Sequence, residues 1–213
     1  DSFLFLEETL KDAKSLGQLY FRGDSHTNWF GAYFVYHAII SRMNEILKKN
    51  RCVKKSPLPL SELQPVLKAY GGDLYTQLDD EMKSYFGRAW KSLNLGDELE
   101  YTVGLKISDH VRTARPAHVE PEIADKIMGR ETFRFVNDDQ SLPKAVIFRD
   151  STSQFIVDLL AEHFSSSLFI WHKGLVYEDI IEREKPDIVL HIMAERFLSQ
   201  YETVKPFSNF FAE

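Results

Sequence analysis

The sequence has few of the features that mark several large classes of protein. Its 213 residues include one cysteine, Cys52, which excludes an intramolecular disulfide framework and a zinc or redox site of the Cys-x-x-Cys type. It has no run of about 18 uninterrupted apolar residues, so we expect no transmembrane segment. Its formal net charge is -6, which gives no bulk positive field for a phosphate backbone. We therefore expect no nucleic-acid partner.

The composition is that of a chain with a substantial core. Hydrophobic residues make up 44% of the chain and aromatic residues 13%, which is enough for one compact domain. We predict a single domain over residues 1–213, in which residues 50–142 contain a helical or irregular insertion. The N-terminus lacks the basic and apolar regions of a signal peptide. Because the chain begins abruptly at Asp1, we expect that upstream sequence is missing.

The last third of the chain has the clearest pattern. Three apolar runs of strand length cover Ala145–Phe148, Leu168–Trp171 and Asp187–Ile192. The segments between them, Gln154–Phe164 and Val176–Glu184, have the spacing of helices. Alternation of strand and helix predicts crossover connections and a sheet covered on both faces. We therefore predict an α/β fold with three αβα layers around a mostly parallel sheet.

The rest of the chain is predicted to alternate helices with short strands. The predicted helices cover residues 3–15, 30–49 and, in two pieces broken at Gly71 and Gly72, 61–92. The predicted strands cover residues 19–21, 101–103 and 111–113. The first of these strands matters most, because a polar turn follows it directly.

Ser151 occupies a position suited to a nucleophile. It follows a predicted buried strand and precedes a predicted helix. Backbone N–H groups at the start of a helix can stabilise an oxyanion. In open parallel sheets, ligands bind at the carboxyl ends of the strands, where Ser151 is expected. The alternative interpretation is that Ser151 only caps the helix.

Asp24 and His26 stand two residues apart in the polar turn after residues 19–21. This spacing lets a carboxylate orient an imidazole through one ring nitrogen while the other ring nitrogen faces a nucleophile. A hydroxyl needs such a base at neutral pH. The alternative is a turn with an Asx hydrogen bond and a surface histidine. The turn and Ser151 together favour a catalytic site more strongly than either does alone.

These motifs resemble those of a known family. Gly23-Asp24-Ser25-His26, with Asn28 and Gly31-Ala32 before a long helix, resembles the D-T-H-W-N-x-x-G-A signature of the alginate O-acetyltransferase family. The segments 148–151, 186–189 and 195–198 resemble its nucleophile block and its closing segment. The resemblance covers about residues 17–47 and 143–200. It implies an SGNH-hydrolase-like fold with a permuted order, in which the Asp-His pair precedes the nucleophile.

Three residues depart from the family pattern. Thr27 stands where the family commonly has tryptophan, and Thr152 stands where an aromatic residue often follows the serine. His191 takes a position in the closing strand that is often acidic. The departures at Thr27 and Thr152 indicate a different acceptor pocket.

The resemblance implies a triad of Ser151 as nucleophile, His26 as general base and Asp24 as the orienting carboxylate. It implies an O-acetyltransferase that acts on a bacterial surface or secreted polysaccharide in the periplasm, although a cytoplasmic location stays open. We expect no metal and no bound cofactor, but an acetyl donor of unknown identity as co-substrate. The expected partners are the polysaccharide acceptor and other polysaccharide-assembly proteins. The alternatives are a carbohydrate O-acetylesterase with the same triad and a catalytically inactive module that binds or assembles glycans.

Four further residues are predicted to contact the substrate: Arg149, Asn28, Trp29 and His172. Arg149 can hold an anionic group, or it can form a structural salt bridge with Asp150 or Glu182. Trp29 can stack on a sugar, although aromatic residues at helical spacing usually belong to a core. His172 leaves the second apolar run at the expected site, and the alternative is a solvated loop histidine.

Overall fold

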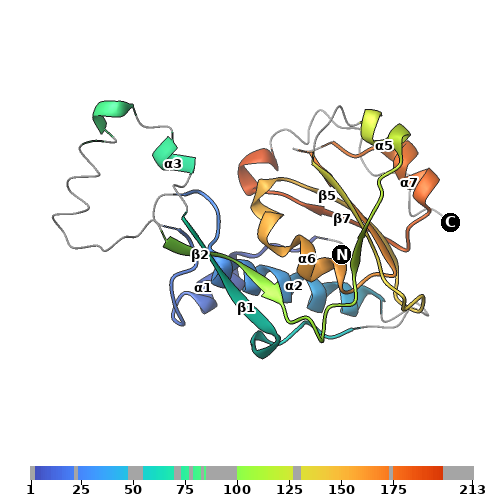
Figure 1. Cartoon of the computed structure of the whole chain (residues 1–213), viewed down its shortest axis with the longest axis horizontal. Coiled ribbons are helices and arrows are strands. Elements are labelled where there is room, and N and C mark those ends of the chain that lie inside the picture. Colours follow the sequence, from blue (N-terminus) through green and yellow to red (C-terminus); the bar gives the residue numbers. More distant parts are fainter. Residues whose placement is uncertain are drawn as a thin grey trace. The chain divides into compact units, whose positions relative to one another are not determined.

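A computed structural model describes residues 3–21, 24–47, 55–69, 73–76, 79–82, 84, 100–126, 131–172 and 175–198 (Figure 1). Contacts between Cα atoms divide the chain into two compact units. The first comprises residues 1–112 and 158–160, and the second comprises residues 113–157 and 161–213. Asp24 and His26 belong to the first unit, and Ser151 belongs to the second.

The second unit contains a five-stranded sheet in the order β3-β4-β6-β5-β7. Its strands are β3 (Arg115–Ala117), β4 (Thr132–Val136), β5 (Lys144–Arg149), β6 (Ser166–Trp171) and β7 (Ile188–Ile192). β5 is parallel to both β6 and β7, whereas β4 is antiparallel to β6 and β3 is antiparallel to β4. The α/β class is confirmed. The sheet is mixed, however, which corrects the prediction of a mostly parallel sheet.

The parallel part of the sheet follows the predicted alternation of strand and helix. After β5 the chain forms η3 (Ser151–Ile156) and α6 (Val157–Ala161), and α7 (Glu178–Glu184) connects β6 to β7. Parallel neighbours need such crossover segments because a tight hairpin reverses the strand direction. The three strands and two helices predicted for the last third are therefore confirmed, with ends shifted by a few residues.

The antiparallel strands were not predicted. In β4, Phe133 is exposed while Arg134 is buried. This reverses the usual relation between polarity and burial, so the alternation of apolar and polar residues does not predict which face of this strand is buried. β3 has only three residues and includes Pro116. Proline is compatible with an edge strand, which is the place that β3 occupies.

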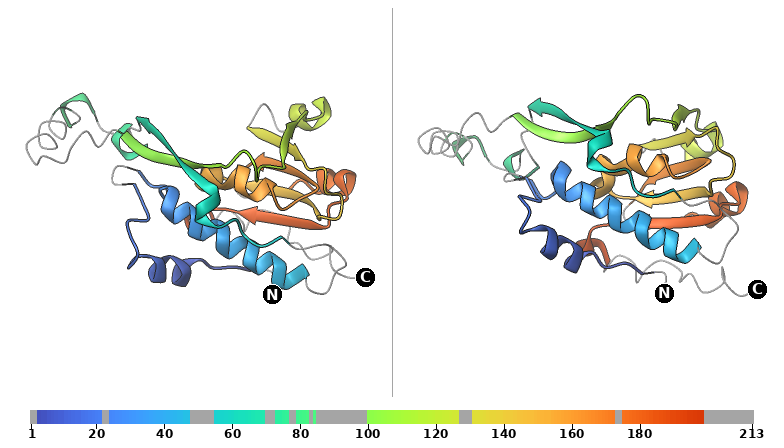
Figure 2. Two further views of the ribbon diagram at one scale, coloured as in Figure 1. Left: turned by 60° about the horizontal axis from the view of Figure 1, so that its bottom comes forward. Right: turned by 90° about the horizontal axis from the view of Figure 1, so that it is seen from below.

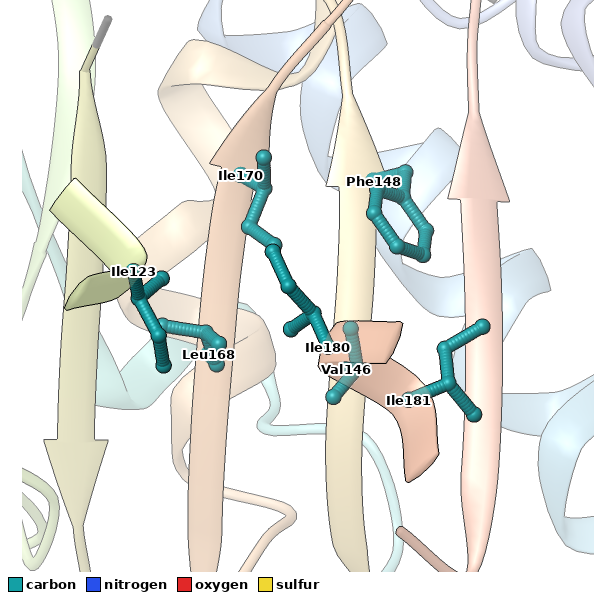
Figure 3. Close-up of a cluster of buried hydrophobic side chains, with 7 residues drawn as sticks. All are labelled: Ile123, Val146, Phe148, Leu168, Ile170, Ile180 and Ile181. Carbon is teal, nitrogen blue, oxygen red and sulfur yellow. The ribbon is translucent and has the colours of Figure 1, made fainter. Parts of the chain in front are cut away.

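A layer of apolar side chains joins two helices to one face of the sheet (Figure 3). The sheet contributes Val146 and Phe148 from β5 together with Leu168 and Ile170 from β6. The helices contribute Ile123 from α5 (Pro121–Lys126) and Ile180 and Ile181 from α7. The intervening strand residues Ala145, Ile147 and Phe169 are buried as well. Both faces of these strands are therefore covered, which explains their uninterrupted apolar sequence.

The first unit has two contacting helices and a two-stranded ribbon (Figure 2). Its elements are α1 (Glu7–Ala13), α2 (Trp29–Ile46), η2 (Leu60–Glu62), β1 (Leu63–Ala69), α3 (Asp73–Thr76) and β2 (Glu100–Ile107). β1 and β2 pair antiparallel. No helix in the described part of the chain is both long enough and apolar enough to span a lipid bilayer.

The first half of the chain contains some of the predicted elements and lacks others. Helices over most of residues 3–15 and 30–49 are confirmed, as is a strand at residues 101–103. Helix over residues 63–69 is wrong because this segment is β1, and residues 111–113 form a turn and coil instead of a strand. The predicted helical residues 48–49, 70–72, 77–78, 83 and 85–92 lie outside the described residues. The single-domain organisation and the insertion over residues 50–142 stay predictions.

A buried ion pair joins β4 to α7 in the second unit. The Arg134 guanidinium donates to both carboxylate oxygens of Glu184, at 3.0 and 2.8 Å, and it also donates to Glu120 at 2.7 Å. Lys144 lies 3.0 Å from Glu184. Hydrogen bonds from Arg134, helped by Lys144, outweigh burial and lower the pKa of Glu184 to about 2. Glu184 is therefore charged at neutral pH.

Glu184→Gln should reduce the free energy of unfolding by about 3 kcal/mol at pH 7, because it leaves a buried guanidinium without its bidentate carboxylate. Since folding lowers the pKa of Glu184, the stabilisation is complete above the unfolded-state value near 4.5 and is lost as the pH falls toward about 2. Urea unfolding across this pH range tests both statements. Glu122→Gln, at an exposed ion pair in the same unit, is the control and should change the stability by less than about 1 kcal/mol. Equal effects of the two variants would contradict the prediction.

Candidate active site

The turn that carries Asp24 and His26 is closed by pairing between its two arms, residues 19–21 and 26–28. Tyr20 and Thr27 form an isolated antiparallel bridge, and the Asn28 N–H donates to the Leu19 carbonyl at 2.8 Å. Residues 19–21 therefore form a bridge and not the predicted strand, and they are not part of the five-stranded sheet. The turn lies in the first unit, directly before α2.

Asn28 fixes this turn to the start of α2. Its side-chain oxygen accepts hydrogen bonds from the backbone N–H groups of Phe30 and Gly31, both at 3.0 Å. Its side-chain nitrogen donates to the Gln18 carbonyl at 2.7 Å. These contacts are those of a helix N-cap. They give Asn28 a structural role, and its contact with substrate stays a prediction.

Gly31 and Trp29 form the first turn of α2. A Cβ atom on Gly31 would lie 2.2 Å from the Leu19 carbonyl oxygen, so only glycine allows the helix to approach this backbone. Trp29 is partly buried, and its ring contacts Phe30 with 5.4 Å between the centroids. The part of the motif that follows His26 thus shapes the turn, and sugar stacking by Trp29 stays a prediction.

Asp24 and His26 form a buried carboxylate–imidazole pair. Asp24 Oδ1 lies 2.5 Å from His26 Nδ1 and also accepts the His26 backbone N–H at 2.7 Å. A carboxylate at Nδ1 favours the tautomer that carries the proton there, which places the ring's acceptor lone pair on Nε2. This tautomer is the one that a general base needs. The structure therefore brings these two predicted residues together, and their catalytic role stays a prediction.

A third ionisable residue of this cluster, Asp73 at the start of α3, was missed by the sequence analysis. Its carboxylate accepts the Ser25 backbone N–H at 2.7 Å and the Ser25 hydroxyl at 2.5 Å. Its own backbone N–H donates to Asp24 Oδ2 at 2.7 Å. Burial alone would raise the pKa of Asp73, but the hydrogen bonds from Ser25 and the charge of His26 bring it below its usual value. No local pattern marks Asp73, because its partners lie 48 and 49 residues away.

Asp24, His26 and Asp73 are also residue types that bind metals, and one ligand atom from each lies within 4.8 Å of the others. The 2.5 Å separation of Asp24 Oδ1 and His26 Nδ1 is, however, that of a short hydrogen bond with a proton between the atoms. A cation bound through Nδ1 would have to displace this proton. The geometry therefore favours a carboxylate–imidazole pair over a metal centre.

Ser151 is the first residue of η3 in the second unit, and it is partly exposed. The N-cap is Asp150, whose Oδ1 accepts the Thr152 N–H at 2.8 Å. Asp150 Oδ2 accepts the Ala194 N–H at 2.8 Å, and the residue is fully buried. The alternative interpretation of Ser151 as the helix cap is therefore wrong, because the neighbouring aspartate performs that role.

His172 directly follows β6 and lies beside the end of β5. Its backbone N–H donates to the Arg149 carbonyl at 2.6 Å, and its Nδ1 accepts the Leu175 N–H at 3.1 Å. The ring is buried and meets Tyr177 edge-on at 5.5 Å. The alternative of a solvated loop histidine is therefore wrong. The contact of His172 with substrate stays a prediction.

Arg149 is buried in β5, and its guanidinium donates to Glu131 at 3.1 Å. It also lies over the Phe133 ring at 5.4 Å. The observed ionic partner is thus neither of the two carboxylates proposed from the sequence, Asp150 and Glu182. Burial lowers the pKa of Arg149, and Glu131 opposes this effect. The contact of Arg149 with an anionic substrate stays a prediction.

The carboxyl ends of the three parallel strands gather several polar residues at one edge of the sheet. These are Arg149 at the end of β5, Asp150 and Ser151 directly after it, His172 after β6, and His191 in β7. Burial lowers the pKa of His191 to about 4, with the charge of Asp150 opposing and that of His172 reinforcing the shift. His191 is therefore neutral at neutral pH. The expected position of Ser151 at the carboxyl edge agrees with this arrangement.

Comparison by sequence finds no matching protein-family model and no matching curated protein. Comparison by structure does find similar folds. PatB1 from Bacillus cereus has a TM-score of 0.57 at 18% identity, with 91% of this chain and 68% of that chain covered. A DHHW family protein from Eubacterium siraeum has a TM-score of 0.58 at 17% identity, with 93% and 68% covered. A second PatB1 structure, with a sulfonyl adduct, has a TM-score of 0.55 at 16% identity, with 88% and 65% covered.

These similarities establish a shared fold. At sequence identities of 16 to 18%, they do not establish the role of any individual residue. The chain spans about two thirds of the length of each of these structures. The chain is thus similar in fold to PatB1 and to a DHHW family protein, and its activity has to be argued from its own residues.

Proposed function

We propose that this chain is a serine-nucleophile O-acetyltransferase that acts on a bacterial polysaccharide. The observation that carries the proposal is the buried pair of Asp24 and His26, in which Asp24 Oδ1 lies 2.5 Å from the ring Nδ1. A histidine held in this way is prepared to accept a proton at Nε2. We assign the Ser151 hydroxyl as the group that gives this proton. The assignment requires the folded chain to bring Ser151 Oγ within hydrogen-bond distance of His26 Nε2.

The reaction has two steps. In the first, His26 Nε2 takes the Ser151 proton as Oγ bonds to the acetyl carbon of the donor. The leaving group departs with that proton, and an acetyl-serine remains. In the second, a sugar hydroxyl gives its proton to His26 and attacks the acetyl carbon, after which the proton returns to Ser151. The Asp24 carboxylate stabilises the imidazolium that forms in each step.

The tetrahedral intermediate of each step needs hydrogen-bond donors for its oxyanion. The Thr152 N–H already donates to Asp150 at 2.8 Å. We assign the Ser151 backbone N–H as one donor, because Ser151 is the first residue of η3, and such a donor typically contributes about 3 kcal/mol. The cap at Asp150 supports this assignment because it places Ser151 in the first turn of η3, where backbone N–H groups point out of the helix.

The partners and the location belong to the same proposal. The acetyl donor is a co-substrate, and the acceptor is a surface or secreted polysaccharide, as the motifs around Asp24 and Ser151 imply. We assign the reaction to the periplasm, with other polysaccharide-assembly proteins as partners. PatB1 has a similar fold and is known with a sulfonyl adduct. Sulfonyl reagents react with activated nucleophiles, so the same class of reagent is a suitable probe for this chain.

Incubation with an activated aryl acetate should add the mass of one acetyl group to the protein, and peptide mapping should place it on Ser151. Adding an acceptor oligosaccharide should then remove the adduct and produce acetylated sugar. Ser141→Ala, which changes an exposed serine in the same unit, should label normally. Loss of the adduct to water alone would identify an O-acetylesterase. Glycan binding without any adduct would contradict both enzymes and identify an inactive binding or assembly module.

A further inference from the structure

We infer that Asp73 is a positioning residue for His26, which it serves by clamping the Asp24–Ser25–His26 turn. This inference rests on the proposed function, because it concerns the general base of that reaction. Asp73 lies at the start of α3 and is far from the turn in sequence. Its contacts reach each of the three residues of the turn.

The contacts between Asp73 and the turn are reciprocal. The carboxylate accepts two hydrogen bonds from Ser25, one from the backbone N–H at 2.7 Å and one from the hydroxyl at 2.5 Å. The Asp73 backbone N–H donates in the opposite direction, to Asp24 Oδ2 at 2.7 Å. The turn is therefore held from both sides, and a rotation of either carboxylate would break at least one of these bonds.

The clamp fixes the orientation of Asp24 in particular. Its Oδ1 accepts both the backbone N–H and the ring Nδ1–H of His26. Its Oδ2 accepts the Asp73 N–H. Both oxygens are thus hydrogen-bonded, and the side chain is fully buried. The imidazole is held by a carboxylate that Asp73 itself holds.

Asp73 also adds a second negative charge near the ring. Its Oδ2 lies 3.8 Å from His26 Nδ1. Because hydrogen bonds from Ser25 keep the pKa of Asp73 below its usual value, this carboxylate is ionised wherever an imidazole titrates. The charge stabilises the imidazolium formed when His26 accepts a proton. Since about a third of the Asp73 side chain is exposed, at 35%, solvent weakens this effect relative to that of Asp24.

Two substitutions separate the clamp from the charge. Asp73→Asn keeps an oxygen for the Ser25 N–H but removes the charge, whereas Ser25→Ala keeps the charge and removes one hydrogen bond of the clamp. Asp79→Asn is the matched control, because Asp79 caps a neighbouring helical turn through the Met82 N–H at 2.7 Å and is exposed. Circular dichroism and thermal unfolding show whether each variant folds.

The first readout is the exchange of the His26 Nδ1 proton with solvent, followed by NMR at a fixed pH and assigned by the loss of its signal in His26→Gln, and it does not depend on activity. Asp73→Asn should speed this exchange about tenfold, because a neutral amide accepts weaker hydrogen bonds from Ser25 and the turn that holds the Nδ1–H bond opens more often. Ser25→Ala should speed the exchange less than Asp73→Asn does, and Asp79→Asn should leave it unchanged. An unchanged exchange rate in a folded Asp73→Asn variant would overturn the inference.

The second readout is turnover of an activated aryl acetate. In Asp73→Asn kcat should fall about tenfold with KM unchanged. If the wild type shows no turnover but Asp73→Asn still speeds the exchange of the ring proton, the positioning role stands and the proposed function fails. If the wild type is active and Asp73→Asn matches Asp79→Asn in both readouts, the positioning role fails and the proposed function stands.

Discussion

Ser151→Ala should reduce kcat/KM for an activated aryl acetate by at least about 1,000-fold, because no other hydroxyl takes the place of a missing nucleophile in a triad. It should also abolish labelling by an aryl sulfonyl fluoride. The protein should stay folded, since Ser151 is partly exposed and the cap of its helix is Asp150. Steady-state kinetics and intact-protein mass spectrometry provide the measurements.

Ser141→Ala is the matched control for this experiment, because it removes an exposed serine hydroxyl from the same unit. It should label and turn over as the wild type does. Full turnover by Ser151→Ala, or a sulfonyl adduct found at another residue, would show that the nucleophile was assigned wrongly. The description of the Asp24–His26 pair would still stand in that case, because it does not depend on Ser151.

Asp24→Asn should lower kcat by about 1,000 to 10,000-fold with little change in KM. Asp24 accepts three N–H groups, two from His26 and one from Asp73. An asparagine at position 24 has only one acceptor oxygen, so at least one of these donors loses its partner. Without a carboxylate at Nδ1, the ring no longer favours the tautomer that leaves Nε2 as the acceptor.

The test is stopped-flow or steady-state kinetics of Asp24→Asn beside Asp79→Asn, which replaces an exposed helix-capping aspartate in the same unit. The control should retain the activity of the wild type. A loss of less than about tenfold in Asp24→Asn would mean that the buried pair is structural. In that case Asp24 would hold the turn together without orienting a base.

The last third of the chain was predictable because its strands are buried on both faces. Ile147 and Phe169 face one side of the sheet and Phe148 and Ile170 face the other, and all four are fully buried. Such strands appear in the sequence as short uninterrupted apolar runs. The intervening α7 has a clear helical spacing around Ile180 and Ile181. Local sequence therefore determined this part of the fold.

The antiparallel elements depend on contacts that local sequence does not reveal. The buried Arg134 of β4 is stable only because Glu184 and Glu120 reach it from other elements. β1 was predicted as helix, and it is a strand because β2 pairs with it from about 40 residues downstream. Tertiary pairing of this kind routinely overrides local propensity.

The candidate site likewise contains residues that local sequence predicts and one residue that it does not. Asp24, His26 and Ser151 lie in short motifs whose spacing is visible in the sequence. The N-cap role of Asn28 follows from its place before a long helix, and it was still interpreted as a substrate contact. Asp73 acts through two hydrogen bonds from Ser25 and one to Asp24. Only the folded chain brings these residues together.

The most direct test of the proposed mechanism is a crystal structure of this chain after reaction with an aryl sulfonyl fluoride. The proposal predicts a sulfonyl group on Ser151 Oγ, with His26 Nε2 within about 3.2 Å of that oxygen and Asp24 on the opposite ring nitrogen. An adduct on a different residue, or an imidazole facing away from Ser151 across the sheet, would contradict the proposed triad.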